Sequence, residues 1–323
     1  MGFWGNRNVF VTGCTGFLGW WLTEELVKQD ANIIGLVRDL VPKSPFFLRG
    51  LDRKITVVHG KLEDYDVIER ALNEHEIDTV FHLGAQAIVG VANRNPMSTF
   101  ESNIKGTWIL LEACRHNPQI SRVIIASSDK AYGQHKTLPY NEDFPLQGNH
   151  PYDVSKSCAD LIARTYNNTY GTPVCITRCG NLFGPGDLNY NRIVPGTIRD
   201  VLNNRRPVIR SDGTPMRDYV FVKDIAVAYM ILAEHMKNRE IHGRAFNFGT
   251  GKPVSVLEIT KLILKVANRE DLEPDVQNTA QGEINHQYLS SELAHSMLGW
   301  KPGASFEARL AESFEWYKSI HAK

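Results

Sequence analysis

Two sets of side chains that can transfer protons lie near the middle of the chain. The segment SSDKAYG (127–133) places Asp129 beside Lys130, directly after the apolar stretch RVIIA. Further along, PYDVSK places Tyr152 and Lys156 four residues apart at an expected helix start, so both lie on one helical face. Carboxyl, phenol and amine groups that follow a strand are the groups that acid–base catalysis uses.

The elements that must position these groups alternate regularly. We expect buried strands at 8–12, 32–37, 55–59, 79–84, 122–127 and 174–178. Amphipathic segments, for example 19–29 and 98–116, lie between these β-branched runs. Strands buried on both faces and separated by helices predict an α/β fold with a doubly wound parallel sheet, the Rossmann architecture that binds nucleotides.

The regular alternation fails beyond residue 178, where Gly, Pro, Asn and Arg become frequent. The segment 244–251 is expected to return a strand to the main sheet. We therefore predict a dinucleotide-binding domain from 1–178 and about 217–250. A smaller, interleaved C-terminal substrate domain is predicted from 179–216 and 251–323.

A glycine-rich turn opens the first expected helix. VTGCTGFLGWWL supplies Gly13, Gly16 and Gly19 between a strand and an apolar helix. Glycine permits positive φ and close approach of the backbone to a ligand, and a helix N-terminus attracts a diphosphate. A tight structural turn would also use glycine, but the strand–turn–helix context favours a dinucleotide site.

The end of the second strand, GLVRDL, bears on the choice of cofactor. Asp39 would accept a hydrogen bond from the ribose 2′-hydroxyl of NAD, whereas Arg38 would bind the 2′-phosphate of NADP. The sequence favours NAD and leaves NADP open.

The pair Tyr152 and Lys156 suits removal of a hydroxyl proton while hydride leaves the same carbon. Lowering a tyrosine pKa from about 10 to about 7 requires roughly 4 kcal/mol. A lysine cation about 5 Å away contributes roughly 3 kcal/mol at an effective dielectric constant of 20. We expect the cationic nicotinamide ring to add the remainder.

Composition excludes several classes of protein. The 323 residues hold 36 basic and 36 acidic side chains, so no overall field favours nucleic acid or an anionic membrane. Five cysteines, an odd number without a C-x-x-C pair, predict neither a disulfide framework nor a zinc site, and no other metal site is expected. The first apolar run is too short for a signal peptide, and no stretch reaches the roughly 20 apolar residues of a membrane span. We expect a cytoplasmic protein.

An ordered set of motifs extends along nearly the whole chain: VTGCTGFLG, FHLGAQ, NIKGT, SSDKAYG, PYDVSK, TRCGNLFGPGD, GTPMRDYVFVKD and LGWKP. This set resembles the extended short-chain dehydrogenase/reductase family, the NAD-dependent nucleotide-sugar epimerases and dehydratases. The resemblance implies that Ser128 binds a sugar hydroxyl, Tyr152 is the base and Lys156 activates it.

The same resemblance implies the binding residues. Contacts to the cofactor are expected at Gly13, Thr15, Gly16, Phe17, Leu18, Gly19, Arg38, Asp39, Leu62, Leu83, Ala85, Asn103, Tyr152 and Lys156. Contacts to a nucleotide-sugar diphosphate are expected at Asn181, Arg192 and Arg217. Gln86 is expected near the substrate or nicotinamide, with a packing role as the alternative. Lys61 departs from the family pattern, because the family usually has an aspartate at this position that contacts the adenine amino group.

The resemblance also implies catalytic roles for Asp129 and Lys130. Simple 4-epimerases tend to have small or neutral residues there, whereas 4,6-dehydratases have acid and base groups, and Asp-Lys resembles the CDP-glucose 4,6-dehydratase branch. Oxidation at C4 acidifies the C5 proton, so water can leave across C5–C6. We assign Asp129 as general acid and Lys130 as base or base-assisting group, with CDP-glucose the leading substrate and GDP-mannose next.

Three alternatives stay open. Asp129 and Lys130 could instead form a surface ion pair in a turn, and in that case the protein could be a 4-epimerase, for example of UDP-glucuronate. A non-catalytic dinucleotide-binding protein is a further alternative, although the intact Ser128, Tyr152 and Lys156 argue against it. Arg38, Arg192 and Arg217 could each be solvated side chains instead of phosphate ligands.

Lesser features have structural interpretations. His82 is expected to be a core histidine, and Trp20 and Trp21 are expected to pack within their helix. The family resemblance further implies a homodimer, in which the helices after Gly106 and Tyr152 form a four-helix interface.

Overall fold

The main sheet of the protein contains seven parallel strands. A computed structural model describes residues 2–279 and 284–321. The strands lie in the order β11-β6-β5-β4-β1-β2-β3. Their bounds are β1 Asn8–Thr12, β2 Asn32–Val37, β3 Thr56–His59, β4 Thr79–His82, β5 Arg122–Ala126, β6 Val174–Cys179 and β11 Ala245–Phe248. The predicted parallel sheet is confirmed, including the late strand that returns to it.

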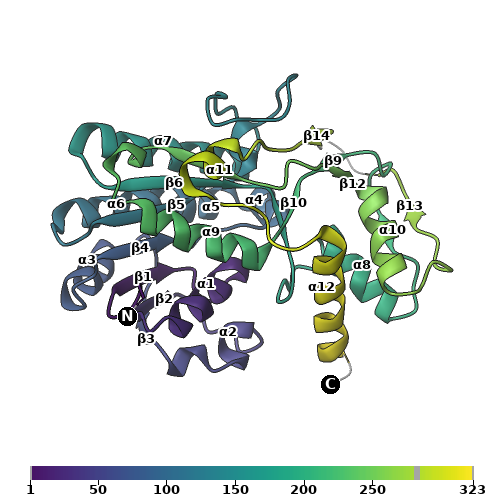
Figure 1. The fold of residues 1–323 in the computed structure, drawn as a ribbon, viewed down its shortest axis with the longest axis horizontal. Helices are drawn as coiled ribbons and strands as arrows, with labels where there is room; N and C mark the ends of the chain where they lie inside the picture. Colours follow the sequence, from purple (N-terminus) through teal and green to yellow (C-terminus); the bar gives the residue numbers. More distant parts are fainter. Residues whose placement is uncertain (1, 280–283, 322–323) are drawn as a thin grey trace.

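Helices cover both faces of this sheet, as Figure 1 shows. One face packs against α1 (Phe17–Lys28), α9 (Val222–His235) and α11 (Glu292–Leu298). The other face packs against α3 (Tyr65–Glu74), α6 (Gly106–His116) and α7 (Pro151–Tyr170). The fold is therefore doubly wound, and the Rossmann prediction is confirmed.

The order of the strands reverses between β1 and β4. From β1 the chain continues to β2 and β3 on one side, whereas β4, β5 and β6 follow on the other. Loops that leave the carboxyl ends of β1 and β4 therefore diverge and open a crevice, the usual ligand position in such sheets. The glycine turn follows β1 at this edge, and Ser128 follows β5.

Helix α7 delivers two of the expected catalytic residues. Its second residue is Tyr152, after Pro151 at the helix start, where a missing N–H costs nothing. The helix ends at Gly171, whose φ of 70° is the left-handed conformation of a helix cap. Tyr152 and Lys156 thus lie on consecutive turns at the end of α7 that meets the sheet edge.

A smaller group of elements lies to the right of the sheet in Figure 1. Helices α8 (Ile193–Leu202), α10 (Val256–Val266) and α12 (Phe306–His321) share an apolar cluster. Short strands join them: β7 Asn181–Phe183, β8 Val208–Ile209, β9 Met216–Arg217, β10 Tyr219–Phe221, β12 Val254–Ser255, β13 Asp275–Val276 and β14 His286–Gln287. Short helices complete the chain: α2 Pro45–Leu48, α4 Val89–Arg94 and α5 Pro96–Phe100, with the single turns η1 Leu51–Arg53, η2 Glu101–Lys105, η3 Asp129–Tyr132 and η4 Arg239–Ile241.

The two regions interleave more deeply than their sequence order suggests. Ala294, Leu298 and Trp300 come from the last part of the chain, yet they pack in the core of the large sheet. The predicted division into 1–178 with 217–250, and 179–216 with 251–323, stays a prediction.

The core holds the residues expected there. His82 is buried between the hydroxyls of Thr12 and Thr107, and burial lowers its pKa to about 3. Trp20 and Trp21 are buried with their ring centroids 3.8 Å apart. Both structural interpretations are confirmed.

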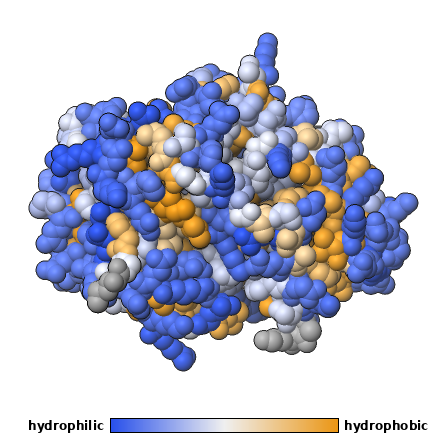
Figure 2. Space-filling model, in the orientation of Figure 1, coloured by the Kyte–Doolittle hydropathy of each residue, from blue (hydrophilic) through white to orange (hydrophobic). Residues whose placement is uncertain are grey.

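The surface, the helices and the cysteines bear on the predictions about membrane spans, disulfides and metal sites. Figure 2 shows a largely hydrophilic face on which apolar side chains form separate patches. Within 2–279 and 284–321, no helix combines the length and apolar character of a membrane span. Over the same residues the cysteines are free and no cluster of metal-ligating side chains occurs.

Candidate active site

A cleft of about 1510 Å³ separates the carboxyl edge of the large sheet from the smaller region. Pockets for a single small ligand measure roughly 300–1,000 Å³, so this cleft has room for a dinucleotide and a second ligand. It is lined by nearly all the residues singled out in the sequence: Gly13, Thr15, Gly16, Phe17, Leu18, Gly19, Arg38, Asp39, Leu62, Leu83, Ala85, Ser128, Asp129, Lys130, Tyr152, Lys156, Asn181, Arg192 and Arg217.

The glycine turn forms the floor of one end of the cleft. Gly13 has φ 72°, and a Cβ on it would lie 2.6 Å from the backbone nitrogen of Gly84. A Cβ on Gly19 would lie 2.0 Å from the carbonyl oxygen of Gly13. No side chain caps the N-terminus of α1, so its first-turn amides are left for a ligand. This backbone cradle fits a diphosphate.

Arg38 and Asp39 lie at the same end, where the adenosine ribose of a dinucleotide is expected. Their side chains are more than half exposed, and Arg38 Nε lies 2.6 Å from Asp39 Oδ2. Leu62 contributes its side chain, which packs beside Gly84 and Gly106. Lys61 is exposed.

Tyr152 and Lys156 lie deeper, beside Ser128. Lys156 is buried, and its Nζ donates to the carbonyl oxygen of Ala126 at 2.8 Å. Burial lowers the pKa of Lys156 to about 8. Burial also raises the pKa of Tyr152 to about 12, against the lowering effect of its hydrogen bond with Ser128.

This result corrects part of the sequence argument. Spacing predicted that Lys156 lowers the pKa of Tyr152, but in the chain alone the burial of Tyr152 dominates. The Lys156 amine donates to Ala126 O instead. Ionisation of Tyr152 near neutral pH therefore requires positive charge beyond that of the chain alone.

Asp129 and Lys130 line the same part of the cleft. Asp129 is 2 % exposed, and its Oδ2 lies 3.6 Å from Lys130 Nζ. Among the described residues, that oxygen has no hydrogen-bond partner. Burial lowers the pKa of Lys130, the nearby Arg217 adds to the lowering, and Asp129 opposes it. The two residues form an ion pair that lines the cleft, in which the Asp129 side chain is 3 % and the Lys130 side chain 21 % exposed.

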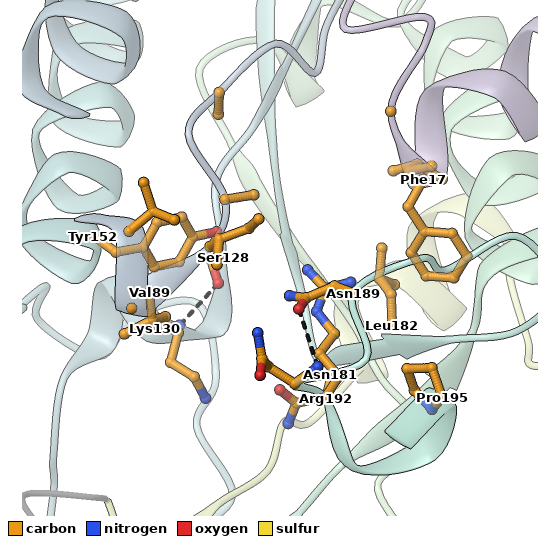
Figure 3. Close-up of a pocket in the computed structure, with 18 of the residues that line it drawn as sticks. Phe17, Val89, Ser128, Lys130, Tyr152, Asn181, Leu182, Asn189, Arg192 and Pro195 are labelled. Carbon is orange, nitrogen blue, oxygen red and sulfur yellow. Dashed lines mark hydrogen bonds between the residues drawn. The ribbon is translucent and has the colours of Figure 1, made fainter. Parts of the chain in front are cut away.

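Hydrogen bonds place this pair relative to Ser128. The Ser128 hydroxyl donates to Asp129 Oδ1 at 3.1 Å and accepts from the Lys130 backbone nitrogen at 3.2 Å. Figure 3 shows Ser128, Lys130 and Tyr152 together on one side of the cleft.

Asn181, Asn189 and Arg192 lie on the opposite side in Figure 3. Arg192 Nη1 donates to the buried Asp187 at 3.1 Å. The side-chain nitrogen of Asn181 is buried and, within the described residues, has no acceptor, which suits a ligand oxygen.

Arg217 lies on β9, where its Nη1 donates to the carbonyl oxygens of Met216 and Asn285 at 2.9 and 3.1 Å. Further arginines line the cleft nearby: Arg94, Arg199, Arg205, Arg206 and Arg210. The sequence showed only that Arg becomes frequent beyond residue 178. A run of charges does not show which of its members face a cavity.

Two predicted residues do not line the cleft. Asn103, in the π-helical turn η2, accepts from the Gln86 backbone nitrogen at 2.7 Å and donates to Gln86 O and Ser155 Oγ. The Gln86 side chain accepts from the Ile88 nitrogen at 3.1 Å. Both residues hold the loop after β4 against α7, and their predicted ligand contacts stay predictions.

We predict that Gly13→Ala weakens NAD binding at least tenfold, or about 1.4 kcal/mol, because its Cβ meets the loop after β4. Gly171→Ala is the matched control, since Gly171 has a similar φ of 70° with nothing within 4 Å of its Cβ. Isothermal titration with NAD checks both variants, and equal affinities in the two would contradict the cradle.

We predict that Lys156→Met stabilises the protein at pH 7. The fall of the Lys156 pKa from 10.5 to about 8 corresponds to about 3 kcal/mol of unfavourable burial below pH 8. Loss of the Ala126 hydrogen bond offsets about 1 kcal/mol of that gain. Because the pKa of Lys156 is lower in the folded protein than in the unfolded chain, this destabilisation decreases as pH rises from 8 to 10.5. The stabilisation by Lys156→Met therefore decreases over the same pH range.

Urea unfolding at pH 7 and pH 10 measures the difference. Lys261→Met, at an exposed position of α10, is the control and should change the free energy of unfolding by less than about 0.5 kcal/mol. If the Lys156→Met variant is less stable than the unaltered protein at pH 7, burial of the Lys156 amine does not destabilise the fold.

Comparison with known proteins agrees with this geometry. Residues 9–249 match the model of the NAD dependent epimerase/dehydratase family. A CDP-glucose 4,6-dehydratase of Salmonella typhimurium is 28% identical over 98% of this chain and 92% of its own length. A putative UDP-glucose 4-epimerase of Methanocaldococcus jannaschii is 29% identical over 96% of this chain and 98% of its own length.

A solved structure extends the likeness to three dimensions. The UDP-glucose 4-epimerase of Thermotoga maritima, solved with UDP-glucose, has a TM-score of 0.89 and 27% identity, covering 98% of this chain and 100% of its own. Dehydratases and epimerases are thus about equally similar to this chain. The chain belongs to the NAD dependent epimerase/dehydratase family, whose enzymes use NAD to act on nucleotide sugars.

Proposed function

We propose that this enzyme is a nucleotide-hexose 4,6-dehydratase, with CDP-glucose the leading substrate and GDP-mannose next. One observation carries the proposal: buried Asp129 and partly buried Lys130 form an acid–amine pair on the cleft wall, bonded to Ser128 and close to Tyr152. The similarity to a CDP-glucose 4,6-dehydratase supports it.

The proposed reaction starts at C4 of the hexose. Ser128 binds the C4 hydroxyl and Tyr152, as the phenolate, takes its proton. NAD held in the cleft by the glycine turn would supply the redox chemistry, as acceptor of the C4 hydride and later as its donor to C6. The bound ligands would lower the pKa of Tyr152 from the raised value that it has in the chain alone.

Elimination then uses the acid–amine pair. Burial and Arg217 lower the pKa of the Lys130 amine, which suits its proposed role as the base, and Asp129 is proposed as the acid. Lys130 takes the C5 proton, and Asp129 protonates the C6 hydroxyl, which leaves as water. Lys130 finally returns a proton to C5. Tyr152 has gained the proton that Asp129 lost, so exchange through water resets the site.

The opposite wall supplies the groups that hold the nucleotide diphosphate. Arg192 and Arg217 offer guanidinium groups, which bind phosphate oxygens strongly, and Asn181 offers its free buried amide. These contacts fix the hexose between the nicotinamide end of the cofactor site and the acid–amine pair.

The second candidate is a 4-epimerase of a UDP-sugar such as UDP-glucuronate. The similarity to the Thermotoga maritima 4-epimerase supports this candidate about as strongly as the similarity to the CDP-glucose 4,6-dehydratase supports a dehydratase. In that case C4 oxidation and reduction suffice, and Asp129 and Lys130 only support the shape of the site.

Incubation with CDP-glucose, GDP-mannose, UDP-glucose and UDP-glucuronate, without added reductant, separates the candidates. We predict a 4-keto-6-deoxy product, detected by the loss of one water in mass spectrometry, from at least one of them. Asp129→Asn should lower water loss by about 10²–10⁴-fold, while the absorbance of reduced cofactor shows that C4 oxidation continues.

Asp143→Asn is the control for this variant, because Asp143 is exposed on the segment after η3. Undiminished water loss in Asp129→Asn would refute the acid role. A product of unchanged mass with inverted C4 would establish the epimerase.

We also propose a homodimer formed through α6 and α7. Apolar side chains are exposed on α5, α6 and α7, with Met97, Trp108 and Leu161 at 76, 41 and 53 %. We expect light scattering to give twice the chain mass of 36.4 kDa at micromolar concentration. Leu161→Glu should reduce the mass to that of one chain, and a 36.4 kDa particle for the unaltered protein would contradict the dimer.

A further inference from the structure

Gln287 joins the smaller region to the acid–amine pair. It lies on β14, opposite Arg217 in the parallel ladder of β14 with β9, and its residue surface is fully buried. Its Nε2 donates to the carbonyl oxygen of Asp129 at 2.7 Å. Its Oε1 accepts from Nζ of Lys130.

These two contacts fix the orientation of the amide. A carbonyl oxygen only accepts, so the Gln287 nitrogen must face Asp129. Oε1 is then the atom that faces Lys130, and the alternative flip would place two acceptors together. Gln287 is therefore a directional acceptor for the Lys130 amine.

We infer that Gln287 is a positioning residue, which holds the Lys130 amine in place for removal of the C5 proton. The inference rests on the proposed dehydration and deepens it. A neutral lysine amine that donates one N–H to Oε1 keeps its lone pair for the substrate. The contact also restricts a long side chain whose free rotation would otherwise have to be lost at each turnover.

A neutral acceptor suits this role better than a charged one. The charged groups that act on Lys130 are Asp129 and Asp153, which favour its cation, and Arg217, which disfavours it. Gln287 adds a hydrogen bond without a third negative charge. A glutamate at the same position would stabilise the cation and remove the base.

The position of Gln287 also links the amine to the diphosphate site. The backbone nitrogen of Met216 donates to Asn285 O at 2.8 Å, and Asp218 N donates to Gln287 O at 3.3 Å. The Arg217 side chain bonds to Asn285 O as well. The proposed phosphate ligand and the holder of the base therefore lie side by side on one ladder.

Gln287→Glu and Gln287→Met test the inference, with Gln119→Glu, an exposed position, as the matched control. The first measurement uses the protein without substrate. Brief labelling with acetic anhydride across pH, read by peptide mass spectrometry, reports how much of the Lys130 amine is neutral. We expect Gln287→Glu to need about one pH unit more for equal labelling, which is a tenfold drop at fixed pH, while Gln119→Glu matches the unaltered protein.

The second measurement uses the nucleotide sugar that the unaltered enzyme dehydrates. The acidic limb of the pH profile for water loss should move up with Gln287→Glu, and C4 oxidation should persist in both variants. Gln287→Met, which keeps the volume without the acceptor, should slow water loss at least tenfold at every pH without moving the limb.

The outcomes separate this inference from the proposed function. An unshifted Lys130 labelling profile in folded Gln287→Glu would overturn the positioning role. Full water loss in Gln287→Met would overturn it too. If the Lys130 labelling profile shifts in Gln287→Glu but the unaltered protein dehydrates none of the sugars, the contact between Gln287 and Lys130 is supported. The proposed dehydratase function is then overturned.

Discussion

Desolvation of charged groups at one edge of a parallel sheet is the constraint on which this site depends. Asp129, Lys156 and His82 are all buried there, and Lys130 lines the same cleft. Burial disfavours every charge, so the two lysine pKa values fall and the tyrosine pKa rises. Such groups are unfavourable for stability, and proteins keep them mainly where chemistry needs them. The fold supplies what the site requires: strands that end together and a smaller region that closes the opposite side.

The fold meets that requirement through close backbone approach. The turn after β1 and the loop after β4 come so near each other that Gly13 has no room for a side chain. The same approach leaves the N-terminus of α1 uncapped toward the cleft. The close contact of the two loops and the uncapped helix end that fits a diphosphate are consequently one geometric feature. The acid–amine pair depends on a longer path, since β14 must return from the far end of the chain to reach it.

Sequence reasoning found most of this arrangement because the relevant signals are local. Runs of β-branched residues predicted the strand positions within one or two residues. The four-residue spacing of Tyr152 and Lys156 predicted that both lie on one face of a helix. Gln287 was not found, because a two-residue strand 157 residues beyond Lys130 leaves no periodic pattern. The direction of the Tyr152 pKa was also missed, since spacing reveals a neighbouring charge but not burial. Residue type and spacing predict which groups meet, and the balance between desolvation and charge requires the packed structure.

Whether Asp129 and Lys130 reach the hexose at C5 and C6 is the question that separates dehydration from simple redox at C4. Reaction with CDP-glucose in heavy water tests it most directly, because a base that removes the C5 proton later returns a solvent-derived one. The account predicts a product that has lost one water and carries one deuterium at C5. A product of unchanged composition, with inverted C4 and no deuterium on carbon, would contradict it.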